Sequence, residues 1–343
     1  MDNFDMAVNT YYQRRYFKSH TIHAIKDMFH YIHSIVRTVL MDNTWKDHAS
    51  EKIAREKASS MEIRVSYPKN LLFVSNFSSL YSDLKLGNEN YFEKVLKVRR
   101  WSTDNSLSLR LNPSQRYALE LRRLFDEYAN GSSAKIIHNY GKNRIEVPTG
   151  ILQKAFFKEN RPESLNWGAI GFLIAQEATN AFFFEGQHYD SRGNGVQWWR
   201  PGVRDDFAKK ENCFDEQYRE YLQNGYGTNV VPHSTFVPPP QYITATAGLK
   251  AAYLAYNIST ISEENEFLPG LAYTPNQLFW ISAAQVMCEK PSEEKIEERL
   301  LNGSYVPAKF RVMGAVSNLP QFAQDFNCPL GAPMNPELKC QVW

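Results

Sequence analysis

Five residues near the middle of the chain, Gln176-Glu177-Ala178-Thr179-Asn180, have the spacing of a helix that binds a metal ion. In the pattern His-Glu-x-x-His, two histidines one helical turn apart bind a single zinc ion, and the glutamate acts on the metal-bound water. Here Glu177 is kept, whereas Gln176 and Asn180 carry amides at the two histidine positions. The segment is therefore either a coincidence of spacing or a metal site that has lost two ligands.

Helices are expected to position this segment. The run Gly168–Phe184 around it is apolar on most faces and predicts a buried helix, and Pro238–Pro240 predicts a loop that leads to Gln241. Arg144–Val147 alternates like a short strand. The other predicted helices cover Ile22–Val39, Thr44–Met61, Tyr91–Arg100, Ser114–Asn130, Ile243–Tyr256 and Asn276–Cys288. The predicted fold class is mainly α with a small β element.

The composition indicates a globular chain and excludes some partners. The 343 residues are 43% hydrophobic, which is enough for a sizeable core. With 39 basic and 37 acidic residues, the formal charge of +2 gives no reason to expect nucleic acid as a partner. No apolar run approaches the roughly 20 residues of a transmembrane helix. The polar and aromatic start, Met1–Ser19, does not predict a secretory signal.

Histidines elsewhere offer a weaker metal site. His30 and His33 could share a helix face near Asp27, but no second helix with a Glu-x-x-His pattern accompanies them. His138 and His188 fall in predicted loops, where the expectation is a surface position. These histidines therefore do not predict a replacement for the missing ligands.

Many collinear runs of this chain resemble the C-terminal half of the neprilysin and endothelin-converting-enzyme family of zinc metallopeptidases. The matching runs are Asn90-Tyr91-Phe92-Glu93, Val147-Pro148-Thr149-Gly150-Ile151-Leu152-Gln153, Asn166-Trp167-Gly168-Ala169-Ile170-Gly171, Tyr189-Asp190, Gly193-Asn194, Trp198-Trp199, Gly248-Leu249-Lys250-Ala251-Ala252-Tyr253, Leu268-Pro269-Gly270-Leu271, Gln277-Leu278-Phe279, Met334-Asn335-Pro336 and Cys340-Gln341-Val342-Trp343. The resemblance covers essentially the whole chain. It implies a zincin-like catalytic domain over residues 101–343 and a remnant of the family's helical lid domain over residues 1–100.

The same resemblance implies that the zinc site of the family is lost. The family's first two ligands fall on Gln176 and Asn180, and its third, a glutamate, falls on Gln241. A carboxamide offers zinc only a weak carbonyl oxygen in place of an imidazole nitrogen or a carboxylate. The aspartate that would orient a ligand histidine has become Ala245. No cofactor is therefore expected, although the family uses zinc.

Other catalytic positions of the family are altered as well. Glu177 matches the general base, the transition-state histidine falls on Tyr305, and its companion arginine is kept as Arg311. The substrate-binding Asn-Ala falls on Lys135-Ile136, or on Asn139-Tyr140 if a gap is allowed. Glu177, Tyr305 and Arg311 are vestigial on this interpretation. Glu177 is expected to be a core carboxylate paired with Arg311.

The cysteines bear on how much of a family member is present. In the family, the last cysteine pairs within the C-terminal half, which implies a disulfide between Cys213 and Cys340. The counterparts of Cys288 and Cys328 pair with cysteines of an N-terminal part that has no match here. The chain is thus either a truncated relative with two free thiols or a fragment of a longer chain.

Two functions follow from this resemblance. The first is an inactive pseudopeptidase that binds peptides or active relatives, and the alternative is a zinc metalloendopeptidase that acts in peptide processing. The family lineage implies an extracellular or membrane-associated protein. This chain, however, has no recognisable signal peptide or membrane anchor, so its compartment stays open.

Overall fold

A computed structural model describes most of the chain. The described residues are 4–16, 19–41, 47–65, 81–111, 134–227, 241–260, 267–301 and 305–342. The predicted helix Ser114–Asn130 and the predicted loop Pro238–Pro240 lie outside them.

The chain divides into two compact units. The first consists of Met1–Ala24, Val65–Lys135 and Val147–Leu152, and the second of Ile25–Arg64, Ile136–Glu146 and Gln153–Trp343. Every predicted ligand or catalytic position except Lys135 belongs to the second unit. The predicted domain boundary near residue 100 stays a prediction.

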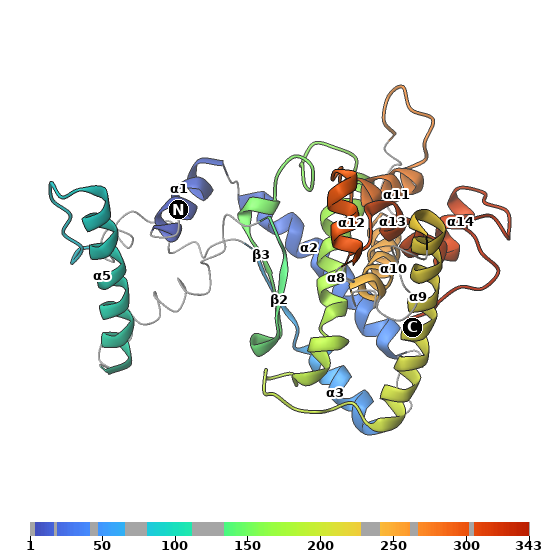
Figure 1. The fold of residues 1–343 in the computed structure, drawn as a ribbon, viewed down its shortest axis with the longest axis horizontal. Helices are drawn as coiled ribbons and strands as arrows, with labels where there is room; N and C mark the ends of the chain where they lie inside the picture. The colour runs from blue at the N-terminus through green and yellow to red at the C-terminus, as the bar shows by residue number, and fades with distance from the viewer. Residues whose placement is uncertain are drawn as a thin grey trace. The chain divides into compact units, whose positions relative to one another are not determined.

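Helices make up most of the described structure, as predicted from the sequence (Figure 1). The α-helices are α1 (Asp5–Tyr16), α2 (Ser19–Met41), α3 (His48–Ser59), α5 (Tyr91–Leu111), α7 (Glu163–Asn166), α8 (Phe172–Asn180), α9 (Pro201–Tyr226), α10 (Gln241–Ser259), α11 (Pro275–Gln285), α12 (Glu293–Leu301), α13 (Ala308–Ser317) and α14 (Pro320–Asp325). Short helical turns cover η3 (Tyr140–Lys142), η4 (Thr149–Ile151), η5 (Trp167–Gly171) and η6 (Phe184–His188).

The β element is a single small sheet in the described residues. It contains β1 (Glu62–Val65), β2 (Ile137–Asn139) and β3 (Arg144–Val147) in the order β1-β3-β2. The predicted strand Arg144–Val147 is confirmed. Strands β2 and β3 run antiparallel, with His138 opposite Ile145 (Figure 1). Because β2 comes last in the strand order, it forms an edge of the sheet.

The helix that carries the motif is shorter than predicted. It opens with a π-helical turn, Trp167–Gly171, continues as α8 and ends at Asn180, rather than reaching Phe184. Phe184 has a φ of 48°, a left-handed backbone conformation that a right-handed helix cannot include. The motif therefore occupies the last turn and a half of its helix.

Helices α8 and α10 pack closely in the core of the second unit. Ile174, Ala175 and Ala178 of α8 are completely buried. Gly248 of α10 lies against the backbone of Gln176, where an added Cβ would approach the Cα and N atoms of Gln176 to 2.5 Å. A glycine at this position permits the close approach, since any side chain would collide with backbone. The packing fixes the motif helix against α10.

No helix among the described residues is both long enough and apolar enough to cross a membrane.

Candidate functional site

The predicted ligand positions lie on two helices in contact. Gln176 and Asn180 are half-buried on α8, and Gln241 is the first residue of α10. Thr179 ties the helices together, because its hydroxyl donates to the carbonyl oxygens of Gln176 (2.8 Å) and of Thr244 (3.3 Å). The site predicted from widely separated segments thus falls at one helix interface, although the assignment of ligand roles stays a prediction.

Ala245 marks the position predicted to have lost an orienting carboxylate. Its side chain is buried on α10, 7% exposed, and has no atom that can accept a hydrogen bond. A polar orienting group at this depth would require a partner on α8 to offset its desolvation. The methyl group instead contributes to apolar packing between the helices.

Glu177 is held by the edge strand of the sheet. One of its carboxylate oxygens, Oε2, accepts a hydrogen bond from the backbone N–H of His138 at 3.1 Å. The charge of Glu177, together with that of Glu185, adds to burial in raising the pKa of Tyr140 to about 12. Glu177 therefore remains a positioned carboxylate at the junction of α8 and β2.

His138 is buried, and the prediction that it lies on the surface is wrong. Its side chain is 6% exposed, its ring centroid lies 5.1 Å from that of Tyr140 with the two rings tilted, and neither ring nitrogen has a hydrogen-bond partner among the described residues. Burial, and then the nearby charge of Lys57, lowers the pKa of His138 to about 3. The imidazole is thus neutral at physiological pH. A three-residue strand is too short for its alternation to be recognised in the sequence.

Lys57 of α3 is a buried cation that the sequence did not single out. Its side chain is completely buried, and its ammonium group donates to the carbonyl oxygens of Gly186 (2.6 Å) and Tyr189 (2.7 Å). Burial lowers the pKa of Lys57 to about 7, and the charge of Asp190 opposes that change. These two hydrogen bonds hold residues 186–189, which follow the motif helix, against α3.

Arg311 does not pair with Glu177, so that prediction is wrong. Its Nη2 donates instead to Oε1 of Glu289 at 2.9 Å and to the carbonyl oxygen of Met287 at 3.3 Å. The same Oε1 accepts from the hydroxyl of Tyr305 at 2.8 Å. Both vestigial residues are therefore engaged by one carboxylate. No motif in the sequence pointed to Glu289, which lies between α11 and α12.

The donors at the predicted positions do not fit a zinc ion. Three carboxamides and an alanine occupy the positions predicted for the ligands and the orienting group, and carboxamide oxygens favour harder cations than zinc. Nor do three His, Cys, Asp or Glu side chains come together as a metal site in the part of the chain that the structure describes. His33, part of the weaker histidine candidate, donates from Nε2 to the carbonyl oxygen of Ala58 at 2.6 Å.

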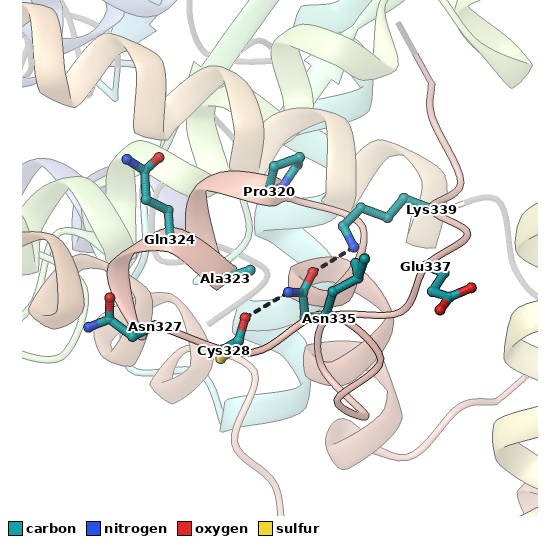
Figure 2. Close-up of a pocket in the computed structure, with 9 residues that line it drawn as sticks. Pro320, Ala323, Gln324, Asn327, Cys328, Asn335, Glu337 and Lys339 are labelled. Carbon is teal, nitrogen blue, oxygen red and sulfur yellow. Dashed lines mark hydrogen bonds between the residues drawn. The ribbon is translucent and has the colours of Figure 1, made fainter.

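The disulfide predicted between Cys213 and Cys340 is confirmed, with a Cα–Cα distance of 5.7 Å. Cys288 and Cys328 are free thiols. Cys328 lines a groove of about 620 Å³ beside α14 (Figure 2), and none of the residues that line this groove belongs to the motif helix. In this groove the amide of Asn335 donates to the carbonyl oxygen of Cys328 at 2.8 Å, and Lys339 donates to Oδ1 of Asn335 at 2.7 Å (Figure 2). The groove is separate from the predicted ligand positions.

The mainly helical fold around the helix of Gln176–Asn180 is that of the zincin-like metallopeptidases. Two sequence profiles of peptidase family M13 match residues 1–68 and 137–342. The chain belongs to this zinc-dependent peptidase family.

Curated relatives agree with this membership, and a solved structure shares the fold. Neprilysin-2 of Drosophila melanogaster is 32% identical over 100% of this chain and 43% of its own length. Endothelin-converting enzyme 1 of Rattus norvegicus is 33% identical over 87% of this chain and 38% of its own length. The zinc metalloprotease Zmp1 of Mycobacterium tuberculosis in its open state has the same fold, with a TM-score of 0.77 at 23% identity over 99% of this chain and 51% of that one. The chain thus spans less than half the length of these two relatives.

Proposed function

We propose that this chain is an inactive pseudopeptidase of the neprilysin type, which has lost the zinc site of its family and acts by binding. The observation that carries the proposal is the donor set, Gln176, Asn180 and Gln241, at the three ligand positions. Each replacement removes a strong zinc ligand, and Ala245 removes the support for one of them. All of these positions are changed together, so the pattern indicates loss of the whole zinc site and not the exchange of one ligand for another.

The remaining groups cannot replace the metal. Zinc lowers the pKa of its bound water from about 15.7 to about 7, which supplies a nucleophile at neutral pH. Glu177 alone, even when positioned by the backbone N–H of His138, has no means of making that change. Tyr305, at the position of the family's transition-state histidine, and its companion Arg311 are both hydrogen-bonded to Glu289. Hydrolysis by the mechanism of the family therefore lacks both its nucleophile and its electrostatic support.

Binding of peptides or of active family members is the function left to the scaffold. The close packing of α8 on α10 and the confirmed disulfide support a stable fold without zinc. A disulfide is typical of an oxidising compartment, which supports the extracellular or membrane-associated location expected from the family.

Metal content and peptidase activity test the proposal. The wild-type chain is purified without chelator, dialysed against zinc and analysed for bound metal, and hydrolysis of a fluorogenic peptide is followed with and without zinc. We expect neither stoichiometric zinc nor hydrolysis. Stoichiometric zinc with chelator-sensitive cleavage would instead support the alternative, a zinc metalloendopeptidase with unusual ligands.

A matched gain-of-function variant provides the control. Gln176→His, Asn180→His and Gln241→Glu together restore the family's ligand types at positions on the packed helices α8 and α10. We expect this variant to bind zinc under conditions in which the wild type does not. A pull-down of peptides and proteins with the wild-type chain then identifies what the scaffold binds.

A further inference from the structure

Three hydrogen-bond donors near the start of α13 converge on one carboxylate oxygen. Oε1 of Glu289 accepts from the hydroxyl of Tyr305 at 2.8 Å, from the backbone N–H of Ala308 at 3.0 Å and from Nη2 of Arg311 at 2.9 Å. Ala308 is the first residue of α13, so its N–H is not used within the helix. A phenol, a free helix N–H and a guanidinium together make a cradle for an anionic oxygen.

The carboxylate that fills the cradle comes from an irregular segment. Glu289 lies between the end of α11 at Gln285 and the start of α12 at Glu293, and its side chain is 26% exposed. Helices α11, α12 and α13 all belong to the second unit. The cradle therefore consists of residues from 305–311, whereas its occupant belongs to a separate stretch of chain.

The charged groups that form and surround the cradle are positive, which suits an anionic ligand better than an apolar one. Arg311 is partly buried, with its side chain 31% exposed, and no donor or acceptor among the described residues contacts its Nε. The guanidinium of Arg299 lies 5.0 Å from the centroid of the Tyr305 ring, which adds a second cation beside the phenol. Two arginines and one carboxylate leave the cluster with an excess of positive charge.

We propose that residues Tyr305, Ala308 and Arg311 form a carboxylate-binding site that Glu289 occupies as an internal ligand. Glu289 masks Arg311, which matches the companion arginine of the family's transition-state histidine, from external carboxylates. Removal of the Glu289 carboxylate opens the site to a small carboxylate ion. The inference does not depend on the proposed loss of zinc, because none of these groups is a predicted zinc ligand.

Chemical rescue tests the proposal. Glu289→Ala removes the internal ligand, and the thermal unfolding midpoint is measured near neutral pH in sodium acetate and in sodium chloride of equal ionic strength. We expect the variant to melt below the wild type, and acetate to raise its Tm by about 2 °C or more over chloride, with saturation. Equal midpoints in the two salts would overturn the proposal.

Two further variants separate specific rescue from a general salt effect. Glu297→Ala removes an exposed carboxylate of α12 and should respond equally to acetate and chloride. The double variant Glu289→Ala with Arg311→Met should lose the acetate effect, and an acetate effect that persists there would count against the site. If Glu289→Ala does not fold in chloride, recovery of folded protein in acetate alone supports the proposal, and failure in both salts contradicts it.

Discussion

Lys57 should make the stability of the protein rise with pH above neutrality. Its ammonium is completely buried, and its pKa falls from 10.5 to about 7 because burial penalises the charge. Between these two values the unfolded chain binds a proton at Lys57 that the folded chain does not. The free energy of unfolding therefore increases as pH rises through the window between about pH 7 and pH 10.5.

The size of the effect follows from the shift. One pH unit within the window corresponds to about 1.4 kcal/mol, so the free energy of unfolding should rise by about 3 kcal/mol from about pH 7 to about pH 9.5. Above that range the tyrosines whose pKa values are raised by burial, such as Tyr218 and Tyr242, reverse the trend. Burial also lowers the pKa of Lys250, which adds to the rise in the same direction, so the contribution of Lys57 is taken from the difference between the wild type and a Lys57 variant.

The assay is urea unfolding at a series of pH values across the window, with the disulfide intact. Lys57→Met should lower stability at neutral pH, because the carbonyl oxygens of Gly186 and Tyr189 lose their donor, and it should also make the rise smaller by about 3 kcal/mol. Lys52→Met, at an exposed position of the same helix, should leave the rise unchanged. A flat wild-type profile, or the same slope in Lys57→Met, would refute the reasoning.

Three further predictions concern the scaffold of the site. Gly248→Ala should destabilise the fold by about 2 kcal/mol, since its methyl group would collide with the backbone of Gln176, and a melting temperature at or above that of the wild type would contradict this. The lowered pKa of His138 contributes stability that is present above about pH 6.5 and lost as pH falls, so His138→Phe should reduce the loss between about pH 6.5 and about pH 5 by about 2 kcal/mol. If urea unfolding gave the wild type and His138→Phe equal losses of unfolding free energy over this pH range, the prediction would be disproved. Arg311→Met should cost about 1–2 kcal/mol by leaving the carboxylate of Glu289 without its cation, and an unchanged denaturation midpoint would argue against that role.

Local patterns predicted much of the fold. The apolar spacing in Ile22–Val39 and in Ile243–Tyr256 indicated helices that the structure contains as α2 and α10, and alternation indicated β3. These signals arise within one segment, where periodicity reflects a single buried face. The helix boundaries were less accurate, because the π-helical turn before α8 and the left-handed Phe184 depend on packing around them.

The contacts of the site could not be predicted in the same way. Lys57 lies among charged residues in the sequence of α3, and only the fold reveals that it is buried. The pairing of Arg311 with Glu289 joins residues 22 positions apart on separate elements. The sequence pairs Arg311 with Glu177 because Glu177 is the one carboxylate that the resemblance names, whereas in the structure Arg311 pairs with Glu289.

The zinc content of the purified wild-type chain, measured beside the variant with Gln176→His, Asn180→His and Gln241→Glu, tests the central claim most directly. We predict that the wild type holds far less than stoichiometric zinc after equilibration and cleaves no fluorogenic peptide, while the variant binds the metal. Stoichiometric zinc in the wild type, together with cleavage that a chelator abolishes, would contradict the account.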